Sequence, residues 1–289
     1  MLKNNVYKMR LKYQFIILFS FLYTYCSFGQ VSELDLQLAQ KYYIDAEYEK
    51  AILYYNKIAK EPNYKLKIYN NYYSSFIELK QFKNAEKLCK DIIKDFPNKL
   101  STVVDLGLLY GLDNKLDKKS QIFDKAIKQI SDQTLYNDAL DLGLAFEKIG
   151  DTDRALSTYL TFESSSKRNI FSFHEKTALL YNKKGEISKM INTFFEMLDQ
   201  SDNFLNTVQN GLINSIDFQN NLKEKEILRK FIIKKIQSEP KKTIYIELLS
   251  WFYMANNDYE NAFTQIKSLD KMLNINGTKV LELGNISLN

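Results

Sequence analysis

The chain has 289 residues, of which 45% are apolar and 26% charged, and its formal net charge is +5. With one histidine and two cysteines, it can form neither a paired-histidine zinc motif nor a framework of several disulfides. It also has no Cys-x-x-Cys pair, nucleophile elbow, phosphate-binding loop or dinucleotide-binding glycine pattern. We therefore expect a protein that is not an enzyme and that holds no cofactor or metal ion.

Residues 1–29 have the pattern of a secretory signal peptide. Four basic residues precede an apolar run at residues 15–25, which is too short for a membrane span of about 20 residues. Small residues at Ser27 and Gly29 offer a cleavage site before Gln30. We predict a cleaved bacterial signal and a mature chain from residue 30, periplasmic or secreted, with no membrane span.

Cys26 raises the alternative of lipid attachment, but it follows Tyr25 rather than the small residue that a lipoprotein acceptor needs. An uncleaved anchor is a further alternative. Either would hold the chain at a membrane. Loss of residues 1–29 would leave only Cys89, so no disulfide could form within the mature chain. Cys89 stands where other segments of the chain place an aromatic, so we interpret it as a core residue.

Export also changes the charge of the protein. Removing the four positive charges of residues 1–29, which contain no acidic residue, from the net charge of +5 leaves +1 for the mature chain. The local basic run at residues 230–242 is interpreted as the solvated face of a helix. The sequence therefore does not predict nucleic-acid binding.

Beyond residue 33 the chain repeats about every 34 residues. Small residues recur in steps of 34 or 35, one of 36 and one of 72, with Tyr73 as the bulky exception, at Ala39, Gly107, Gly143, Ala178, Ser250 and Gly284. A second series runs in phase at Ala51, Ala85, Lys119, Ala155, Met190 and Ala262. A fixed period of this size predicts a solenoid.

Each repeat contains the elements of two helices. Large apolar residues three and four apart mark one helix face, as in Leu142-Gly143-x-x-Phe146 and Ala155-x-x-x-Tyr159. Small residues let the two helices cross closely, so Gly107 and Gly143 are predicted to face a second helix. Between the helices lie the turn residues Ala46-Glu47, Gly150-Asp151, Gly185-Glu186 and Asn257-Asp258. A glycine or asparagine just past a helix end supplies a left-handed cap. The three prolines, Pro62, Pro97 and Pro240, fall where the second helix of a repeat ends.

This arrangement resembles the tetratricopeptide repeat (TPR) family, whose signature is Leu-Gly-x-x-Tyr in helix A, Ala-x-x-x-Phe in helix B and a closing proline. The resemblance implies an all-α, right-handed α-solenoid of about seven helix pairs over residues 30–289, plus the start of an eighth; a HEAT-type solenoid is the alternative. The predicted units are 34–64, 65–98, 99–132, 133–167, 168–202, 203–240, 241–274 and the partial 275–289. Unit 203–240 lacks the Leu-Gly motif.

The resemblance also implies a concave groove lined by helix A, which would bind a protein or peptide. The positions that match this groove are Tyr43, Ile77, Leu108, Leu112, Leu140, Leu144, Trp251 and Met254, with Leu36, Ile44 and Leu179 on the same face. The paired lysines and asparagines of the family's carboxylate clamp are absent. We expect an exported, non-enzymatic scaffold; the alternative is the N-terminal sensory or substrate-holding arm of a larger receptor or cell-envelope enzyme.

The end of the sequence reproduces the start of a further helix A, from Val280 to Ile286. Terminal repeats need a polar outer face, which these apolar residues do not give. The sequence therefore predicts a longer TPR protein or an interrupted gene, or else a dimer that covers the open end.

Overall fold

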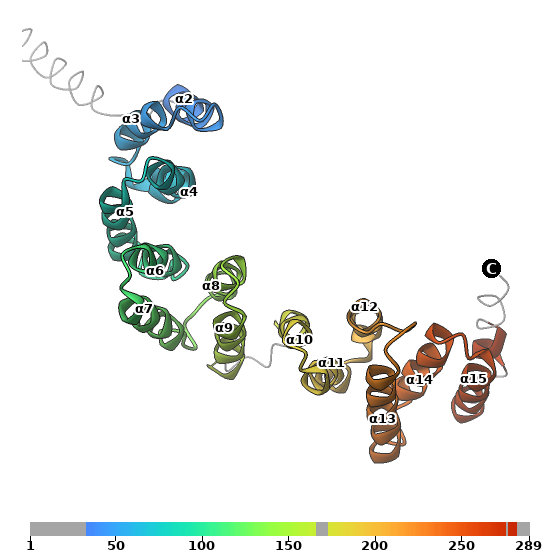
Figure 1. The fold of residues 1–289 in the computed structure, drawn as a ribbon. Coiled ribbons are helices and arrows are strands. Elements are labelled where there is room, and N and C mark those ends of the chain that lie inside the picture. The colour runs from blue at the N-terminus through green and yellow to red at the C-terminus, as the bar shows by residue number, and fades with distance from the viewer. Residues whose placement is uncertain (1–32, 166–172, 276, 282–289) are drawn as a thin grey trace, which may run out of the picture. The chain divides into compact units, whose positions relative to one another are not determined.

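The computed structural model describes residues 33–165, 173–275 and 277–281, and in these ranges the regular structure is helical (Figure 1). The predicted signal peptide lies outside them. No described helix is long and apolar enough to cross a membrane. The helices are α2 (Glu33–Ile44), α3 (Tyr48–Ile58), α4 (Pro62–Glu78), α5 (Phe82–Asp95), α6 (Thr102–Leu112), α7 (Leu116–Lys128), α8 (Tyr136–Lys148), α9 (Thr152–Ser165), α10 (His174–Lys183), α11 (Ile187–Gln200), the 3-10 helix η1 (Asp202–Phe204), α12 (Leu205–Ser215), α13 (Leu222–Ser238), α14 (Ile244–Ala255) and α15 (Tyr259–Leu273).

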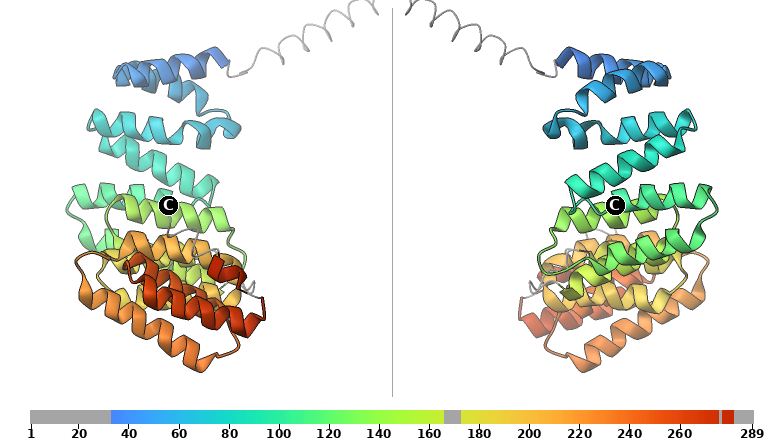
Figure 2. Two further views of the ribbon diagram at one scale, coloured as in Figure 1. Left: turned by 90° about the vertical axis from the view of Figure 1, so that its right-hand side faces the viewer. Right: turned by 90° about the vertical axis from the view of Figure 1, so that its left-hand side faces the viewer.

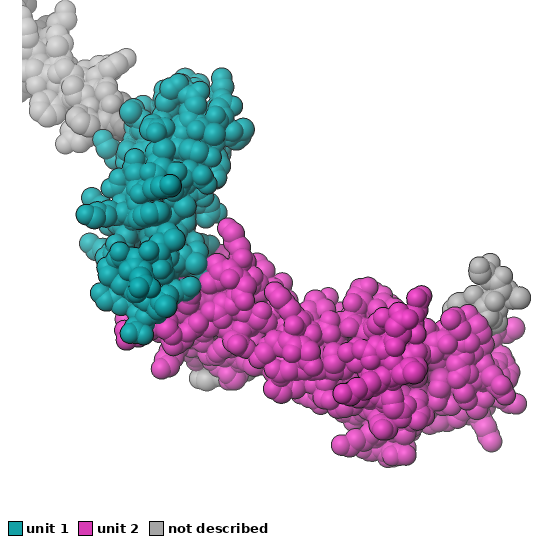
Figure 3. All heavy atoms as spheres, in the orientation of Figure 1, with its two compact units in different colours: residues 1–119 teal, residues 120–289 magenta. Residues whose placement is uncertain are grey.

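The helices form pairs in chain order, as the period predicts. α2 packs on α3, α4 on α5, α8 on α9, α10 on α11 and α14 on α15, and Figure 2 shows the two pairs of residues 33–95 as successive layers. The chain divides into two compact units, unit 1 up to Lys119 and unit 2 from Ser120, and the boundary falls within α7 (Figure 3). The all-α repeat fold is therefore confirmed. α4 begins three residues before the predicted unit boundary, because Pro62 fits the first position of a helix.

The turns between paired helices share one geometry. The second residue after helix A has a positive φ at Asn114, Gly150, Gly185 and Asn257, between 54° and 76°, as predicted for the last three. The backbone N–H of the residue that follows it then donates to a carbonyl five residues earlier, which belongs to the aromatic of the Leu-Gly-x-x-Tyr pattern. These acceptors are Tyr42, Phe76, Tyr110, Phe146, Tyr181 and Tyr253. The bond satisfies a carbonyl that the end of helix A leaves unpaired.

In two of these turns the left-handed position holds a residue for which this conformation is unfavourable. Ala46 and Lys80 have φ values of 58° and 54°, a region that costs an L-residue roughly 1 to 2 kcal/mol. Both side chains are exposed. We expect Ala46→Gly and Lys80→Gly each to stabilise the protein by about 1 kcal/mol, and Gly150→Ala to destabilise it by a similar amount. Urea unfolding of the three variants beside the parent measures this. Destabilisation by both glycines would contradict the turn geometry.

The predicted crossing at Gly143 is confirmed. A Cβ placed on this glycine of α8 would lie 2.2 Å from Cε1 of Tyr159 in α9. The Tyr159 ring is fully buried, and its hydroxyl donates to Glu147 Oε1 at 2.6 Å. Helix A therefore has a small residue at this point, because the aromatic ring of the Ala-x-x-x-Tyr pattern packs directly over it.

The divergent unit 203–240 departs from the paired arrangement. Its small residue is Gly211, which divides the step of 72 residues between Ala178 and Ser250 unequally, so the repeat period did not predict it. A Cβ on Gly211 would lie 2.3 Å from Cζ of Phe194 in α11, which is the helix B of the preceding pair. α12 thus packs on α10, α11 and α14, and α13 packs on α11 and α14.

The reason for this departure lies in the connection after α12. The helix ends at Ile216 in an extended conformation, with φ −112° and ψ 129°, instead of a left-handed turn. Asp217 then accepts the backbone N–H groups of Gln219 and Asn220 in a separate turn. Without the left-handed residue α13 does not fold back on α12 as the other second helices do.

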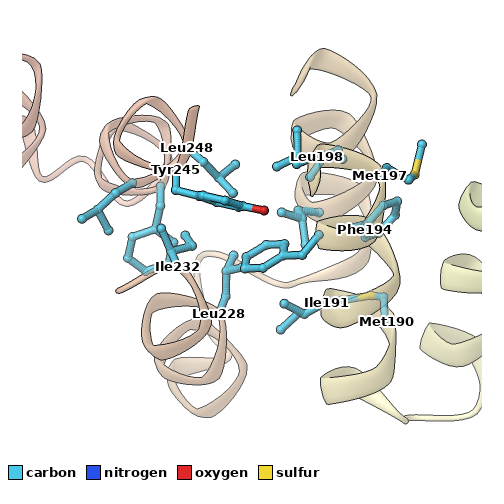
Figure 4. Packing of buried hydrophobic residues seen from close by; sticks show 14 of the residues in the cluster. Met190, Ile191, Phe194, Met197, Leu198, Leu228, Ile232, Tyr245 and Leu248 are labelled. Atoms are coloured by element: carbon cyan, nitrogen blue, oxygen red, sulfur yellow. The ribbon is translucent and has the colours of Figure 1, made fainter. Parts of the chain in front are cut away.

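The core of unit 2 includes the apolar side chains packed between α11 and α13. Figure 4 shows Phe194 and Ile191 of α11 facing Leu228 and Ile232 of α13, with Tyr245 of α14 beside them. All five side chains are fully buried. The pair α10–α11, the divergent helices α12 and α13, and α14 therefore share one continuous apolar cluster.

Part of the basic run at residues 230–242 is tied to this core. Lys235 and Lys242 both contact Asp199 of α11 and lie 5.5 Å from the centre of the Tyr245 ring. Tyr245 also donates its hydroxyl to Asp199. Burial opposes ionisation of Asp199, but the hydrogen bonds from Lys235 and Tyr245 outweigh it and lower the pKa of the carboxyl. Lys235 and Lys242 therefore take part in the packing. The side chains of Lys230, Lys234 and Lys241, in contrast, are exposed to solvent.

A further helical turn follows α15. The backbone N–H groups of Lys279 and Val280 donate to the two carboxylate oxygens of Asp270, each at 3.0 Å, and Asp270 is almost fully buried. Val280 packs on the apolar cluster of α14 and α15. The turn is described as far as Leu281. The predicted helix A from Val280 to Ile286 therefore lies mostly outside the described residues and stays a prediction.

Candidate functional site: the helix-A faces

The predicted groove residues all lie on first helices of pairs. In unit 1 they are Tyr43 on α2, Ile77 on α4, and Leu108 and Leu112 on α6. Leu112 is 63% exposed, and Ile44, next to Tyr43, is 79% exposed. Tyr43, Ile77 and Leu108 are half-buried. Unit 1 thus presents isolated exposed aliphatic side chains at the ends of its helix-A faces.

In unit 2 the predicted residues lie on two helices. Leu140 and Leu144 belong to α8, and Trp251 and Met254 belong to α14. Leu144 is 41% exposed, whereas the other three are half-buried. Leu179 of α10, on the same helix-A face, is 43% exposed. Leu144 and Leu179 are the accessible members of this face.

Two residues of the helix-A set contribute to the core. Leu36 is 3% exposed, so its assignment to a groove is wrong; it points into the packing of α2. Trp251 packs edge to face on Phe218, with ring centres 5.7 Å apart, and joins the large cluster of unit 2. The sequence showed these as apolar positions at helical spacing. That spacing alone does not separate a residue facing a groove from one facing the next helix.

Beside the exposed Leu112 lies an open cleft of about 670 Å³ at the turn end of unit 1. Phe82 of α5 and Tyr110 of α6 supply apolar walls, and Lys80 and Lys83 stand at its edge. Lys115, also at this edge, is paired with Asp113. The repeat pattern did not predict this cleft, because its residues come from two turns that belong to different repeats.

The described residues offer little catalytic chemistry. They contain no group of three or more histidine, cysteine or acidic side chains placed to hold a metal ion. Cys89 is fully buried, and burial raises the pKa of its thiol to about 12. Its Sγ lies 3.4 Å from the hydroxyl of Tyr69, which donates to Asp105 at 2.7 Å. The interpretation of Cys89 as a core residue is confirmed, and such a thiol is a poor nucleophile.

His174 is the first residue of α10, the first helix of its pair. Its Nδ1 is 2.8 Å from Glu163 Oε1 at the end of α9, and its Nε2 is 3.4 Å from Glu196 Oε2 in α11. The repeat pattern did not reveal these two carboxylates, which are 11 and 22 residues away along the chain.

The paired helices, their left-handed turns and the crossing of an aromatic over a small residue are the features of an all-α helical-repeat fold of the tetratricopeptide type. No family profile matches the sequence, and no curated protein is similar to it. The assignment of the fold therefore rests on the structural features of the chain itself.

Solved structures with a similar order of helices include the MamA protein, at 16% identity over 60% of this chain and 93% of MamA, with a TM-score of 0.32. The C-terminal part of a TPR protein from Cytophaga hutchinsonii is 16% identical over 84% of this chain and 97% of its own, with a TM-score of 0.32. A TPR protein from Parabacteroides merdae is 14% identical over 69% and 77%, also with a TM-score of 0.32. Likenesses this low say nothing about partners.

Proposed function

We propose that the protein is an exported, non-enzymatic scaffold that binds a protein or peptide on its helix-A faces. The observation that carries this proposal is the exposure of aliphatic side chains on first helices, Leu112 in unit 1 and Leu144 and Leu179 in unit 2. Helical repeats place such side chains along one face, where a partner segment can bury them. The chain's lack of catalytic motifs agrees with a binding role.

The partner-binding test compares exposed leucines on the two kinds of helix. Mature protein, from residue 30, is used to capture partners from a periplasmic extract, and the bound proteins are identified by mass spectrometry. Leu112→Asp and Leu144→Asp are expected to fold and to reduce capture of the same partner at least tenfold, because a carboxylate must then be desolvated in the interface.

Leu53→Asp and Leu222→Asp are the controls for that experiment. Both side chains are more than 70% exposed, and they lie on the second helices α3 and α13. These variants should capture the partner as the parent does. Equal loss with all four variants would mean that the helix-A faces have no special part in binding.

Export is tested separately by N-terminal sequencing of the protein from the periplasm or medium. The predicted result is a chain that begins at Gln30. A protein that retains residues 1–29 in the membrane would contradict the export proposal and leave the binding proposal untouched.

A second candidate function is a sensory or substrate-holding arm within a larger receptor or cell-envelope enzyme. The helical turn that begins at Thr278 favours it, since Asp270 holds the backbone N–H groups of that turn and Val280 packs on the last described pair. Reading the DNA downstream of the gene tests it. A continuing repeat pattern followed by a membrane span and a catalytic domain would support this candidate, and an unrelated sequence would exclude it.

A further inference from the structure

The open cleft of about 670 Å³ in unit 1 is formed by two turns, the one between α4 and α5 and the one between α6 and α7. This turn cleft has apolar side chains that are accessible to solvent. Phe82, the first residue of α5, is 39% exposed, and Leu112, the last residue of α6, is 63% exposed. The half-buried Tyr110 also lines it. A partner that enters the turn cleft can therefore bury large apolar side chains from both turns.

The charged side chains of the turn cleft leave it positive. Its two acidic residues, Glu86 and Asp113, are each paired with a neighbouring lysine. Lys80 and Lys83 also line the cleft, their side chains are exposed, and no carboxylate of the residues that the structure describes is paired with either of them. The turn cleft therefore presents two positive charges beside its exposed apolar side chains.

The repeat register shows that a lysine is unusual at one of these positions. In the other pairs joined by a left-handed turn, the second residue of the second helix is acidic or neutral, at Glu49, Asp117, Asp153, Ser188 and Glu260. In α5 it is Lys83. The first turn of a helix favours an acidic residue, because its free N–H groups carry partial positive charge. The stability of α5 therefore does not explain Lys83.

A second position of the repeat changes in the same two turns. The residue after the left-handed one is acidic in the four turns outside the cleft, at Glu47, Asp151, Glu186 and Asp258. It is Gln81 in the turn between α4 and α5, and Lys115 in the turn between α6 and α7. The departures from the acidic pattern at this position thus coincide with the two turns that form the cleft.

The residues around the turn cleft favour a peptide over a membrane as its occupant. The preceding turn of unit 1 carries Glu47 and α3 carries Glu49, and Asp117 follows the cleft in α7. An anionic bilayer would approach these carboxylates as well as the two lysines, whereas a peptide side chain can enter the cleft alone. The volume of the cleft is also that of a site for a small ligand or a few side chains.

We propose that the turn cleft binds an acidic peptide segment of the partner protein, in which a large apolar side chain is flanked by carboxylates. The apolar side chain contacts Phe82 and Leu112, and the carboxylates pair with Lys80 and Lys83. The charge pairs at the edge select the partner, while burial of the apolar side chain holds it. This inference rests on the proposed function, because Leu112 belongs to both sites, and it adds the chemical class of the partner.

Selection from a random heptapeptide library displayed on phage tests this proposal, with the mature protein, from residue 30, immobilised. The expected result is enrichment of peptides that combine several acidic residues with leucine, phenylalanine or tryptophan. The most enriched peptide is then synthesised with a fluorescent label, and its binding is measured by anisotropy. Replacing its carboxylates by amides should weaken binding about tenfold. No enrichment, or enrichment of basic or uncharged peptides, would overturn the proposal.

Charge reversal locates the binding in the turn cleft. Lys80→Glu combined with Lys83→Glu should weaken binding of the labelled peptide about tenfold or more. Lys83→Glu by itself should raise Tm by about 1 to 3 °C, because it places an acidic residue in the first turn of α5, so its loss of binding cannot come from unfolding. Lys67→Glu with Lys94→Glu is the control, since both lysines are exposed in unit 1 and neither lines the cleft. Equal loss of binding in the control would refute the assignment, as would a lower Tm of Lys83→Glu.

Two further results separate this proposal from its alternatives. Binding of the parent to phosphatidylglycerol vesicles that is lost with the two cleft lysines, without selection of acidic peptides, would assign these lysines to a membrane surface and overturn the proposal. Capture from the extract that falls with Leu112→Asp and Leu144→Asp, but not with the two lysine changes, would refute the acidic partner and leave the proposed function intact. Acidic peptides that bind the cleft, together with capture unaffected by Leu144→Asp, would instead support the turn cleft and contradict binding along the helix-A faces.

Discussion

Phe194→Ala is expected to destabilise unit 2 by about 3 to 5 kcal/mol. The ring is fully buried at the centre of the cluster shared by α11, α13 and α14, and it covers Gly211 of α12 at a distance that leaves no room for a methyl group. Removing it opens a cavity between four helices at once. Little can move to fill that space, because α13 is held on α11 by the same cluster.

Urea unfolding followed by circular dichroism measures this change, and hydrogen exchange of the amides in α11, α13 and α14 locates it. Phe263→Ala is the control, since this phenylalanine of α15 is 45% exposed and should cost less than about 1 kcal/mol. Equal losses in the two variants would show that α11 and α13 do not share a core.

Gly143→Leu is expected to destabilise the α8–α9 pair by about 3 kcal/mol, the upper end of the usual cost of overpacking. The new Cβ would meet the Tyr159 ring at 2.2 Å, and the hydrogen bond from Tyr159 to Glu147 restrains that ring. Even Gly143→Ala should destabilise, although alanine favours a helix over glycine by up to about 1 kcal/mol.

Gly111→Ala is the matched control for the effect of helix propensity. A Cβ there would lie 3.4 Å from Cδ of Lys119, a flexible side chain, so nothing rigid opposes it. This variant should therefore stabilise the protein by up to about 1 kcal/mol. Thermal unfolding compares the three proteins. If Gly143→Ala stabilised as much as Gly111→Ala, the crossing of Tyr159 over α8 would be wrong.

The sequence by itself predicted the repeat, its helix pairs and most of its turns, because these depend on residues close together along the chain. Gly150, Gly185 and Asn257 predicted left-handed turns, and those turns are present. Gly143 predicted a close crossing, since only a small residue lets an aromatic pack directly on a helix. Cys89 was placed in the core by its register alone.

Only the tertiary structure decided how these elements use the space between repeats. Leu36 and Leu144 were both assigned to helix-A faces, yet Leu36 is buried and Leu144 is exposed, because burial depends on which neighbouring helix covers a face. One extended residue, Ile216, directs α13 toward α11 and α14 instead of back onto α12. Likewise Glu163, His174 and Glu196 come from three helices whose packing brings their side chains together. A local pattern fixes the direction of a side chain on its own helix, but the contact it makes depends on a second helix, often more than 30 residues away.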